Sequence, residues 1–234
     1  MSKKGKRKAQ KKNNAQQTTA NRKNNESKSK IIPIVVILSI ILCVIAAVAI
    51  IMTIMSNNQS DMTNDKSNKT YYADIHIKDY GKITVKLDPS AAPKTVDNFI
   101  NLANSKFYDG LTFHRIIKDF MMQGGDAQGT EKSSMAKNIV GEFKQNGYDN
   151  PISHVRGTIS MARVGGDPDS ADSQFFIVHK DSLYLDGQYA AFGTVTEGMN
   201  VVDRICEEAQ PVDNDGTIAE DQQPVINSIR IRSE

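Results

Sequence analysis

The chain has 234 residues, of which 39% are hydrophobic, and a net charge of +2 at pH 7, which suits one good-sized domain with appendages. The small net charge hides an asymmetry, because residues 1–30 carry eleven Lys/Arg against one acid while the other residues carry 18 Lys/Arg against 26 acids. Two cysteines, Cys43 and Cys206, are too few for a disulfide framework, so a disulfide-stapled mini-protein is excluded. We expect Cys206 to be a small buried hydrophobe.

The basic segment, residues 1–30, is rich in Lys, Asn and Gln and has no hydrophobic period, so we expect a disordered tail. One interpretation is attraction to anionic lipid, with each basic side chain near the surface contributing about 1 kcal/mol. The alternative is a nucleic-acid-binding tail, but single-strand binders interleave aromatic residues for stacking, and this segment has none. We therefore favour lipid as the tail's partner and do not expect nucleic acid.

An uncharged run, IIPIVVILSIILCVIAAVAIIMTIM, occupies residues 31–55. As a helix it would be about 37 Å long, which is enough to cross a hydrocarbon core of about 30 Å. The alternative is a cleavable signal peptide with Ala47–Ala49 as processing site, but the apolar regions of such peptides span roughly 7–15 residues. The run predicts an uncleaved transmembrane helix. The positive-inside bias places residues 1–30 in the cytoplasm and residues 56–234 outside.

Residues 56–70 are polar and without pattern, as in a flexible linker. Residues 71–77 and 81–87 alternate apolar and polar side chains about a short turn, which predicts a β-hairpin. Pro93 then precedes a predicted helix, with Thr95 as its N-cap. We expect its apolar side to consist of Val96, Phe99, Ile100, Leu102 and Ala103.

The remaining elements are mostly short strands. We expect a short strand within the glycine-rich loops of residues 126–157 and a second helix over residues 199–206. The other strands are predicted at residues 111–117, 157–163, 173–179, 189–195 and 224–232. Many short strands with two helices favour a closed antiparallel barrel over alternating βαβ units.

Several segments in this order carry a family resemblance: FHRII, FMMQGGD, GTISMAR, SQFFIVH, LDGQYAAFG and GMNVVDRI. From about Tyr72 to Arg232 the chain closely resembles the cyclophilin-type peptidyl-prolyl isomerases. The resemblance implies a mainly β fold, a closed eight-stranded antiparallel barrel capped by two α-helices, here preceded by the single transmembrane helix. It also implies a groove on the outer surface of the barrel that catalyses X–Pro cis/trans isomerisation without a metal or cofactor.

The resemblance also implies a set of site residues. Arg115 would donate a hydrogen bond to the proline nitrogen, and Gln123 would contact the peptide backbone and orient Arg115. The proline pocket would be formed by Phe120, Met121, Phe176 and Leu185, with Arg115, Phe120 and Gln123 as the catalytic set. Residues implied to contact the flanking peptide are Ala162, Arg163, Gln174 and, as a looser match, Gly129.

The sequence departs from the best-known eukaryotic members at several positions and in these resembles bacterial cyclophilins. Tyr184 stands where a tryptophan is usual, Tyr189 where a histidine lines the pocket, and Arg163 where an asparagine is usual. Lys118 and Asp119 replace a Pro-Gly turn. Tyr189 keeps an aromatic wall, so we expect proline binding to survive these changes.

The residue types suit this chemistry. Twisting an X–Pro amide destroys its resonance, which creates a barrier of about 18–20 kcal/mol, but no bond is made or broken. A donor to the proline nitrogen helps because that nitrogen regains its lone pair as the amide twists. His114 offers a possible general base, but the reaction gives it no proton to move. We expect His114 to point to the face opposite Arg115 as a packed, hydrogen-bonded histidine.

We therefore expect a monomeric, single-pass membrane protein whose extracytoplasmic domain isomerises X–Pro bonds in proline-containing polypeptides, assisting the folding of exported proteins. A rival hypothesis is a catalytically weak, proline-binding chaperone or scaffold at the membrane. A third makes the basic tail, residues 1–30, the functional part as a nucleic-acid tether.

Overall fold

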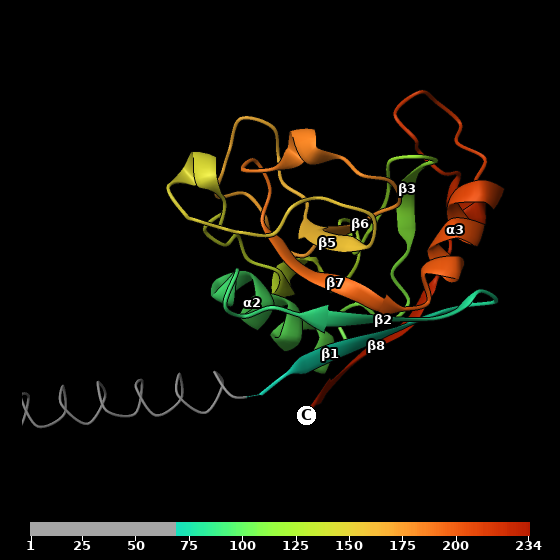
Figure 1. The fold of residues 1–234 in the computed structure, drawn as a ribbon. Coiled ribbons are helices and arrows are strands. Elements are labelled where there is room, and N and C mark those ends of the chain that lie inside the picture. The colour runs from blue at the N-terminus through green and yellow to red at the C-terminus, as the bar shows by residue number, and fades with distance from the viewer. Residues whose placement is uncertain (1–68) are drawn as a thin grey trace, which may run out of the picture. The chain divides into compact units, whose positions relative to one another are not determined.

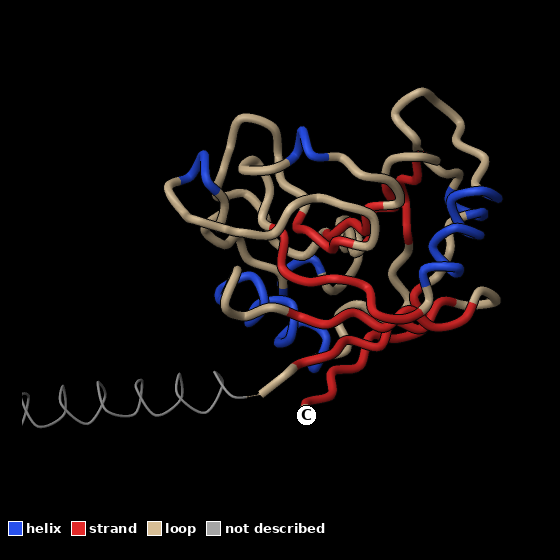
Figure 2. The backbone as a smooth tube through the Cα atoms, in the orientation of Figure 1, coloured by secondary structure: helices blue, strands red, loops and turns tan. Residues whose placement is uncertain are grey.

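The computed structural model describes residues 69–234, so the predicted tail, the transmembrane segment at residues 31–55 and most of the linker lie outside the described residues. Eight strands form one antiparallel sheet in the order β3-β4-β6-β5-β7-β2-β1-β8 (Figures 1 and 2). Their bounds are β1 Tyr71–Ile77, β2 Gly81–Leu87, β3 Phe113–Ile117, β4 Met121–Gly124, β5 Thr158–Met161, β6 Phe175–Val178, β7 Ala191–Glu197 and β8 Ile226–Ser233.

The predicted hairpin is confirmed as β1 and β2, and the predicted strands on either side of residue 170 are confirmed as β5 and β6. The short strand expected within residues 126–157 was misplaced. That segment contains two 3₁₀ turns, Ser133–Met135 and Lys144–Asn146, and the strand lies earlier, at β4. The run of Phe and Met before Gln123 hid β4, because a continuous apolar run lacks the alternation that marks a strand.

The expectation of a closed barrel was wrong. The sheet is an open, curled half-barrel whose end strands are β3 and β8, and no strand ladder joins them within the described residues. The segment between α3 and β8 occupies the free edge of β3 instead. It forms isolated bridges there, between Thr112 and Val225 and between Arg115 and Thr217. The edge of β3 is therefore covered, which protects it from pairing with another chain.

Two helices pack against this sheet: α2, Pro93–Asn104, against β8, and α3, Met199–Glu208, against β2 and β4 (Figure 1). None of the helices in residues 69–234 is long and apolar enough to cross a membrane. The core between sheet and helices contains an aromatic cluster of Phe99, Tyr108, Phe175 and Phe192 with ring centroids 5.1–5.5 Å apart. Cys206 on α3 is buried as expected, and burial raises the pKa of its thiol to about 12.

The predicted N-cap of α2 was wrong by three residues. The helix begins at Pro93 after Ala92, with no side-chain cap of its own. Proline suits this first position because its missing N–H would be unpaired anyway. The buried carboxylate of Glu142 caps the helix from a distant loop, accepting bonds from the Lys94 N–H at 3.0 Å, the Thr95 N–H at 2.8 Å and the Thr95 hydroxyl at 2.8 Å.

The long-range cap yields a stability prediction. Glu142→Ala removes three hydrogen bonds to a charged acceptor and leaves two helix N–H groups unpaired, so we expect the free energy of unfolding to fall by about 2–3 kcal/mol. Urea denaturation of residues 69–234 measures this, with the exposed Glu131→Ala as matched control. A loss of less than about 0.5 kcal/mol in Glu142→Ala would contradict the assignment.

A buried histidine, His154, and a half-buried one, His114, make stability depend on pH. Burial lowers the pKa of His154 and of His114 below the ordinary value of 6.5; Asp186 partly opposes the effect at His154. As pH falls through about 6.5, the folded domain thus binds fewer protons at these two rings than the unfolded chain does. The free energy of unfolding should therefore decrease as pH falls from 7.5 to 5.5, by up to about 1.4 kcal/mol for each ring that stays neutral.

Denaturation midpoints at several pH values test this dependence. His154→Gln should flatten the slope between pH 7.5 and 5.5, whereas His76→Gln, at an exposed position, should leave it unchanged. An equal slope in wild type and His154→Gln would show that this ring does not carry the effect.

Candidate active site

Cross-strand register places a row of functional side chains on the outer face of the sheet. Arg115 on β3 lies opposite Gln123 on β4, and Gln123 lies opposite Phe176 on β6, which in turn lies opposite Ser160 on β5. Directly paired residues share a face, so these side chains form one line. The next row faces the core and consists of Ile116, Met122, Ile177 and Ile159, all 0% exposed.

A β-bulge makes this arrangement possible. The β3–β4 register shifts between Phe113 and Arg115, so His114 has no partner in the ladder. Without the shift, Phe113 and Arg115 would share a face; with it, Phe113 enters the core and Arg115 stays outside. The expectation of a hydrogen-bonded His114 was wrong, because its buried Nδ1 has no hydrogen-bond partner within residues 69–234.

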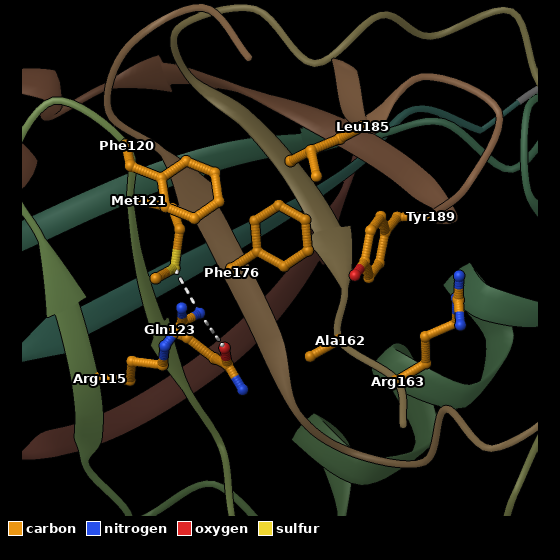
Figure 3. Close-up of a pocket in the computed structure, with 9 residues that line it drawn as sticks. All are labelled: Arg115, Phe120, Met121, Gln123, Ala162, Arg163, Phe176, Leu185 and Tyr189. Carbon is orange, nitrogen blue, oxygen red and sulfur yellow. Dashed lines mark hydrogen bonds between the residues drawn. The ribbon is translucent and has the colours of Figure 1, made fainter. Parts of the chain in front are cut away.

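The Arg115 guanidinium is held by three contacts, of which Figure 3 shows those with Gln123 and Met121. Its Nε–H donates to the backbone carbonyl of Asp215 at 2.7 Å. Its Nη1 donates to Gln123 Oε1 at 3.3 Å and lies 3.9 Å from Met121 Sδ. Gln123 is itself fixed by donating from Nε2 to Gln174 Oε1 at 2.9 Å. Because both sides of the fork are tied down, the remaining N–H groups have a defined direction.

The loop that carries Asp215 lies against β3 because a glycine follows it. Gly216 has φ +87°, and a Cβ there would lie 2.4 Å from Ile117 Cγ1. The Ile116 N–H donates to the Gly216 carbonyl at 2.8 Å, which fastens the loop to the strand edge. A residue with a side chain would push the loop away and remove the carbonyl that holds Arg115.

Beside Arg115 a small cavity of about 140 Å³ with both apolar and polar walls opens on the surface (Figure 3). It sits over a second hydrophobic cluster, separate from the core, that contains Met121, Phe176, Val178 and Leu185. The cavity is lined by Arg115, Phe120, Met121, Gln123, Ala162, Arg163, Phe176, Leu185 and Tyr189. A site of this size fits one compact apolar group beside a cation.

A buried polar chain supports the floor of the cavity. His154 Nε2 lies 3.0 Å from Ser160 Oγ, and its Nδ1 lies 2.9 Å from Asp186 Oδ1. The His154 ring stacks on Phe176 at 6.0 Å between centroids. Asp186 directly follows the 3₁₀ turn Leu183–Leu185, which carries Leu185 on the wall of the cavity. The hydrogen-bonded side chains thus connect this turn to the Phe176 ring on β6. Ser160 and His154 are fully buried, so this Ser-His-Asp arrangement braces the pocket and offers no accessible nucleophile.

The turn before Phe120 shows how the Lys118–Asp119 departure is accommodated. Asp119 has φ +60°, a conformation that glycine adopts freely and that aspartate tolerates. Its N–H donates to His179 Nδ1 at 3.0 Å. Asp119 therefore adopts the positive φ that a glycine would adopt at this position, and Phe120 lines the cavity.

The structure brings nine of the twelve predicted site residues around the cavity. Gln174 lies one hydrogen bond behind Gln123, and Tyr184, 64% exposed, lies at the rim with its ring 5.9 Å from Phe120. Gly129 is not among the residues that line this cavity. Its neighbours Gln128 and Thr130 line a different cavity, because the loop of residues 126–130 turns back on itself.

Sequence reasoning missed the residues that position the site. Asp215 and Gly216 act through their backbone, and His154 lies beneath the pocket. Phe143, which precedes Arg163 by 20 residues, stacks on its guanidinium. The motif DNDG, residues 213–216, was the available signal, since Asx residues before glycine indicate a tight turn. Nothing in the sequence indicated that this turn meets β3.

Comparison with known proteins agrees with the geometry. The family model for cyclophilin type peptidyl-prolyl cis-trans isomerase/CLD matches residues 72–233. Peptidyl-prolyl cis-trans isomerase B of Bacillus subtilis is 46% identical over 123 residues, covering 53% of this chain and 82% of that protein. Peptidyl-prolyl cis-trans isomerase A of Dickeya dadantii is 45% identical over 132 residues, covering 54% and 67%.

Among solved structures, a Cryptosporidium parvum cyclophilin type peptidyl-prolyl cis-trans isomerase, crystallised in the presence of the dipeptide Ala-Pro, matches with a TM-score of 0.59 and 29% identity. The match covers 70% of this chain and 99% of that one. A chain with little beyond this domain therefore folds on its own. The present chain belongs to the cyclophilin family of peptidyl-prolyl cis-trans isomerases.

Proposed function

We propose that the cavity receives the proline ring of an X–Pro segment and that Arg115 donates to the proline nitrogen as the amide twists. The observation that carries this proposal is the guanidinium fixed at the wall of the cavity by hydrogen bonds to Asp215 and Gln123 and by its contact with Met121 Sδ. Isomerase activity itself follows from the family. The role of each residue is the proposal.

The energetics show why both the cation and its apolar neighbours are needed. A hydrogen bond from a charged donor contributes about 1.5–3 kcal/mol, or roughly one to two powers of ten in rate. A millionfold acceleration would require about 8 kcal/mol. Phe120, Met121 and Phe176 supply the remainder by excluding water, which strengthens the field of the guanidinium, and by holding the amide part-twisted.

The substrate main chain is proposed to lie along Ala162 and Arg163. The Ala162 N–H already donates to the Gln174 carbonyl at 2.8 Å. The Ala162 carbonyl is therefore the group proposed to accept a substrate N–H. Gln174 then has two tasks, since it fixes Ala162 through its backbone and Gln123 through its side chain.

The membrane part of the function is also proposed here. The uncharged run at residues 31–55 and the basic residues before it support an anchored enzyme whose domain faces the exterior, monomeric and acting on exported proteins. The basic tail would hold anionic lipid on the cytoplasmic side.

Replacing Arg115 tests the donor assignment. Arg115→Ala in residues 69–234 should lower kcat/KM for an X–Pro peptide by about 10- to 100-fold, because one charged hydrogen bond is lost. Arg115→Lys should lie between wild type and alanine, since lysine keeps the charge without the fork. Exchange NMR on a short X–Pro peptide measures this, and Arg204→Ala, on α3, is the control.

Equal activity in wild type and Arg115→Ala would contradict the donor assignment. A wild-type domain no faster than buffer, yet still binding the peptide, would instead favour the proline-binding chaperone hypothesis.

Protease accessibility tests the topology. Protease added to intact cells that express the full chain should remove the domain, while a cytoplasmic marker stays intact, because the domain is expected outside. Complete protection of the domain in intact cells, with digestion after permeabilisation, would place it on the other side of the membrane.

A further inference from the structure

Arg163 is held in an unusual way for a cation at the edge of the pocket. Its guanidinium lies between two aromatic rings, 5.3 Å from the Phe143 centroid and 4.9 Å from the Tyr189 centroid. Its Nε–H donates to the Gln188 carbonyl at 2.9 Å, and its Nη1 donates to the Val164 carbonyl at 3.1 Å. The side chain is half-buried, so the charge is both ordered and partly dehydrated.

This charge is not neutralised by the protein. Neither Arg163 nor Arg115 has an ion-pair partner within residues 69–234. The residues that line the cavity include these two arginines and no acid. The chain beyond residue 30 carries 18 Lys/Arg against 26 acids, so the pocket is a positive site in an acidic background.

We propose that Arg163 makes the enzyme select X–Pro segments that carry an acidic side chain within two residues of the proline. The inference rests on the proposed use of the cavity for proline and adds the substrate class. A carboxylate is the complementary group, because a guanidinium has five N–H donors and only two of those on Arg163 are used by backbone carbonyls.

The geometry sets which part of the substrate reaches this charge. Tyr189 stands between the Arg163 guanidinium and the Phe176 ring, with the two aromatic centroids 5.8 Å apart and nearly perpendicular (Figure 3). Tyr189 therefore separates the guanidinium from the Phe176 ring, against which the proline is proposed to pack. An extended chain advances about 3.3 Å per residue, so a neighbour one or two positions from the proline lies within reach as the chain follows Ala162.

The expected size of the selection follows from ordinary ion pairs. Exposed pairs contribute a factor of about 1.4 to 5 in an equilibrium, because two flexible side chains must be ordered. The Phe143 and Tyr189 rings have already ordered Arg163, so the upper end of this range applies to its attraction for a substrate carboxylate. A substrate lysine at the same position is repelled by Arg163. We expect about a fivefold preference of glutamate over glutamine and about a tenfold preference of glutamate over lysine.

A peptide series tests the inference. Short peptides with one central proline carry Glu, Gln or Lys at each of the two positions before and the two positions after it. Exchange NMR gives kcat/KM for each peptide with residues 69–234, and the readout is the Glu-to-Lys ratio within one variant. A general loss of activity or of folded protein cancels in that ratio. It should decline as salt rises from 50 mM to 0.5 M, because screening weakens the pair.

Two variants separate specificity from packing. Arg163→Gln should bring the ratio to about 1 at the position where wild type prefers glutamate. Arg204→Gln is the matched control, because Arg204 also stacks on a ring, Tyr80 at 4.8 Å, and donates to two backbone carbonyls, but lies outside the cavity lining. It should leave the ratio unchanged.

Three results would overturn the inference. The first is a wild-type ratio near 1 at all four positions, and the second is a ratio that survives Arg163→Gln or ignores salt. The third is a wild-type enzyme that fails to isomerise even the glutamine peptides, which would remove the proposed function and this inference with it. Normal turnover of the glutamine peptides without a charge preference removes the inference alone.

Discussion

The register of β3 against β4 and of β4 against β6 is the constraint on which the site depends. It sets Arg115, Gln123 and Phe176 in one row on the outer face and their neighbours in a row that fills the core. A slip of one residue would exchange the two rows, burying the guanidinium and exposing the core side chains. The same side chains that make the core thus keep the catalytic row in place. The bulge at His114 is the local irregularity that allows β3 to serve both.

The site combines a guanidinium fixed by hydrogen bonds with an apolar surface that is supported from beneath. Arg115 is tied by one backbone carbonyl and one side-chain amide, neither of which is charged, so its field is not cancelled. Beneath the cavity, His154 stacks on Phe176 and hydrogen-bonds to Asp186, which follows the cavity-lining Leu185. This arrangement suits a reaction without proton transfer, which requires a hydrogen-bond donor of fixed orientation and a surface that excludes water from the proline ring.

Much of this was predictable from the sequence, and the failures have physical causes. Alternation identified the hairpin of β1 and β2, and the segments around Arg115, Gln123 and Phe176 identified the pocket. The closed barrel failed because no local pattern shows that residues 211–225 take the edge of β3. Thr95 failed as a cap because Glu142, 47 residues away, does that work. Gly129 lies outside the cavity lining, which the sequence could not show because a motif does not fix where a loop turns.

The most direct test of the account is a crystal structure of residues 69–234 with a bound X–Pro peptide. The account predicts that the proline ring packs against Phe176 inside the cavity and that Gln123 does not move. It also predicts that a guanidinium nitrogen of Arg115 lies about 3 Å from the proline nitrogen. A proline bound elsewhere, or an Arg115 side chain that leaves Asp215 and turns away from the amide, would contradict it.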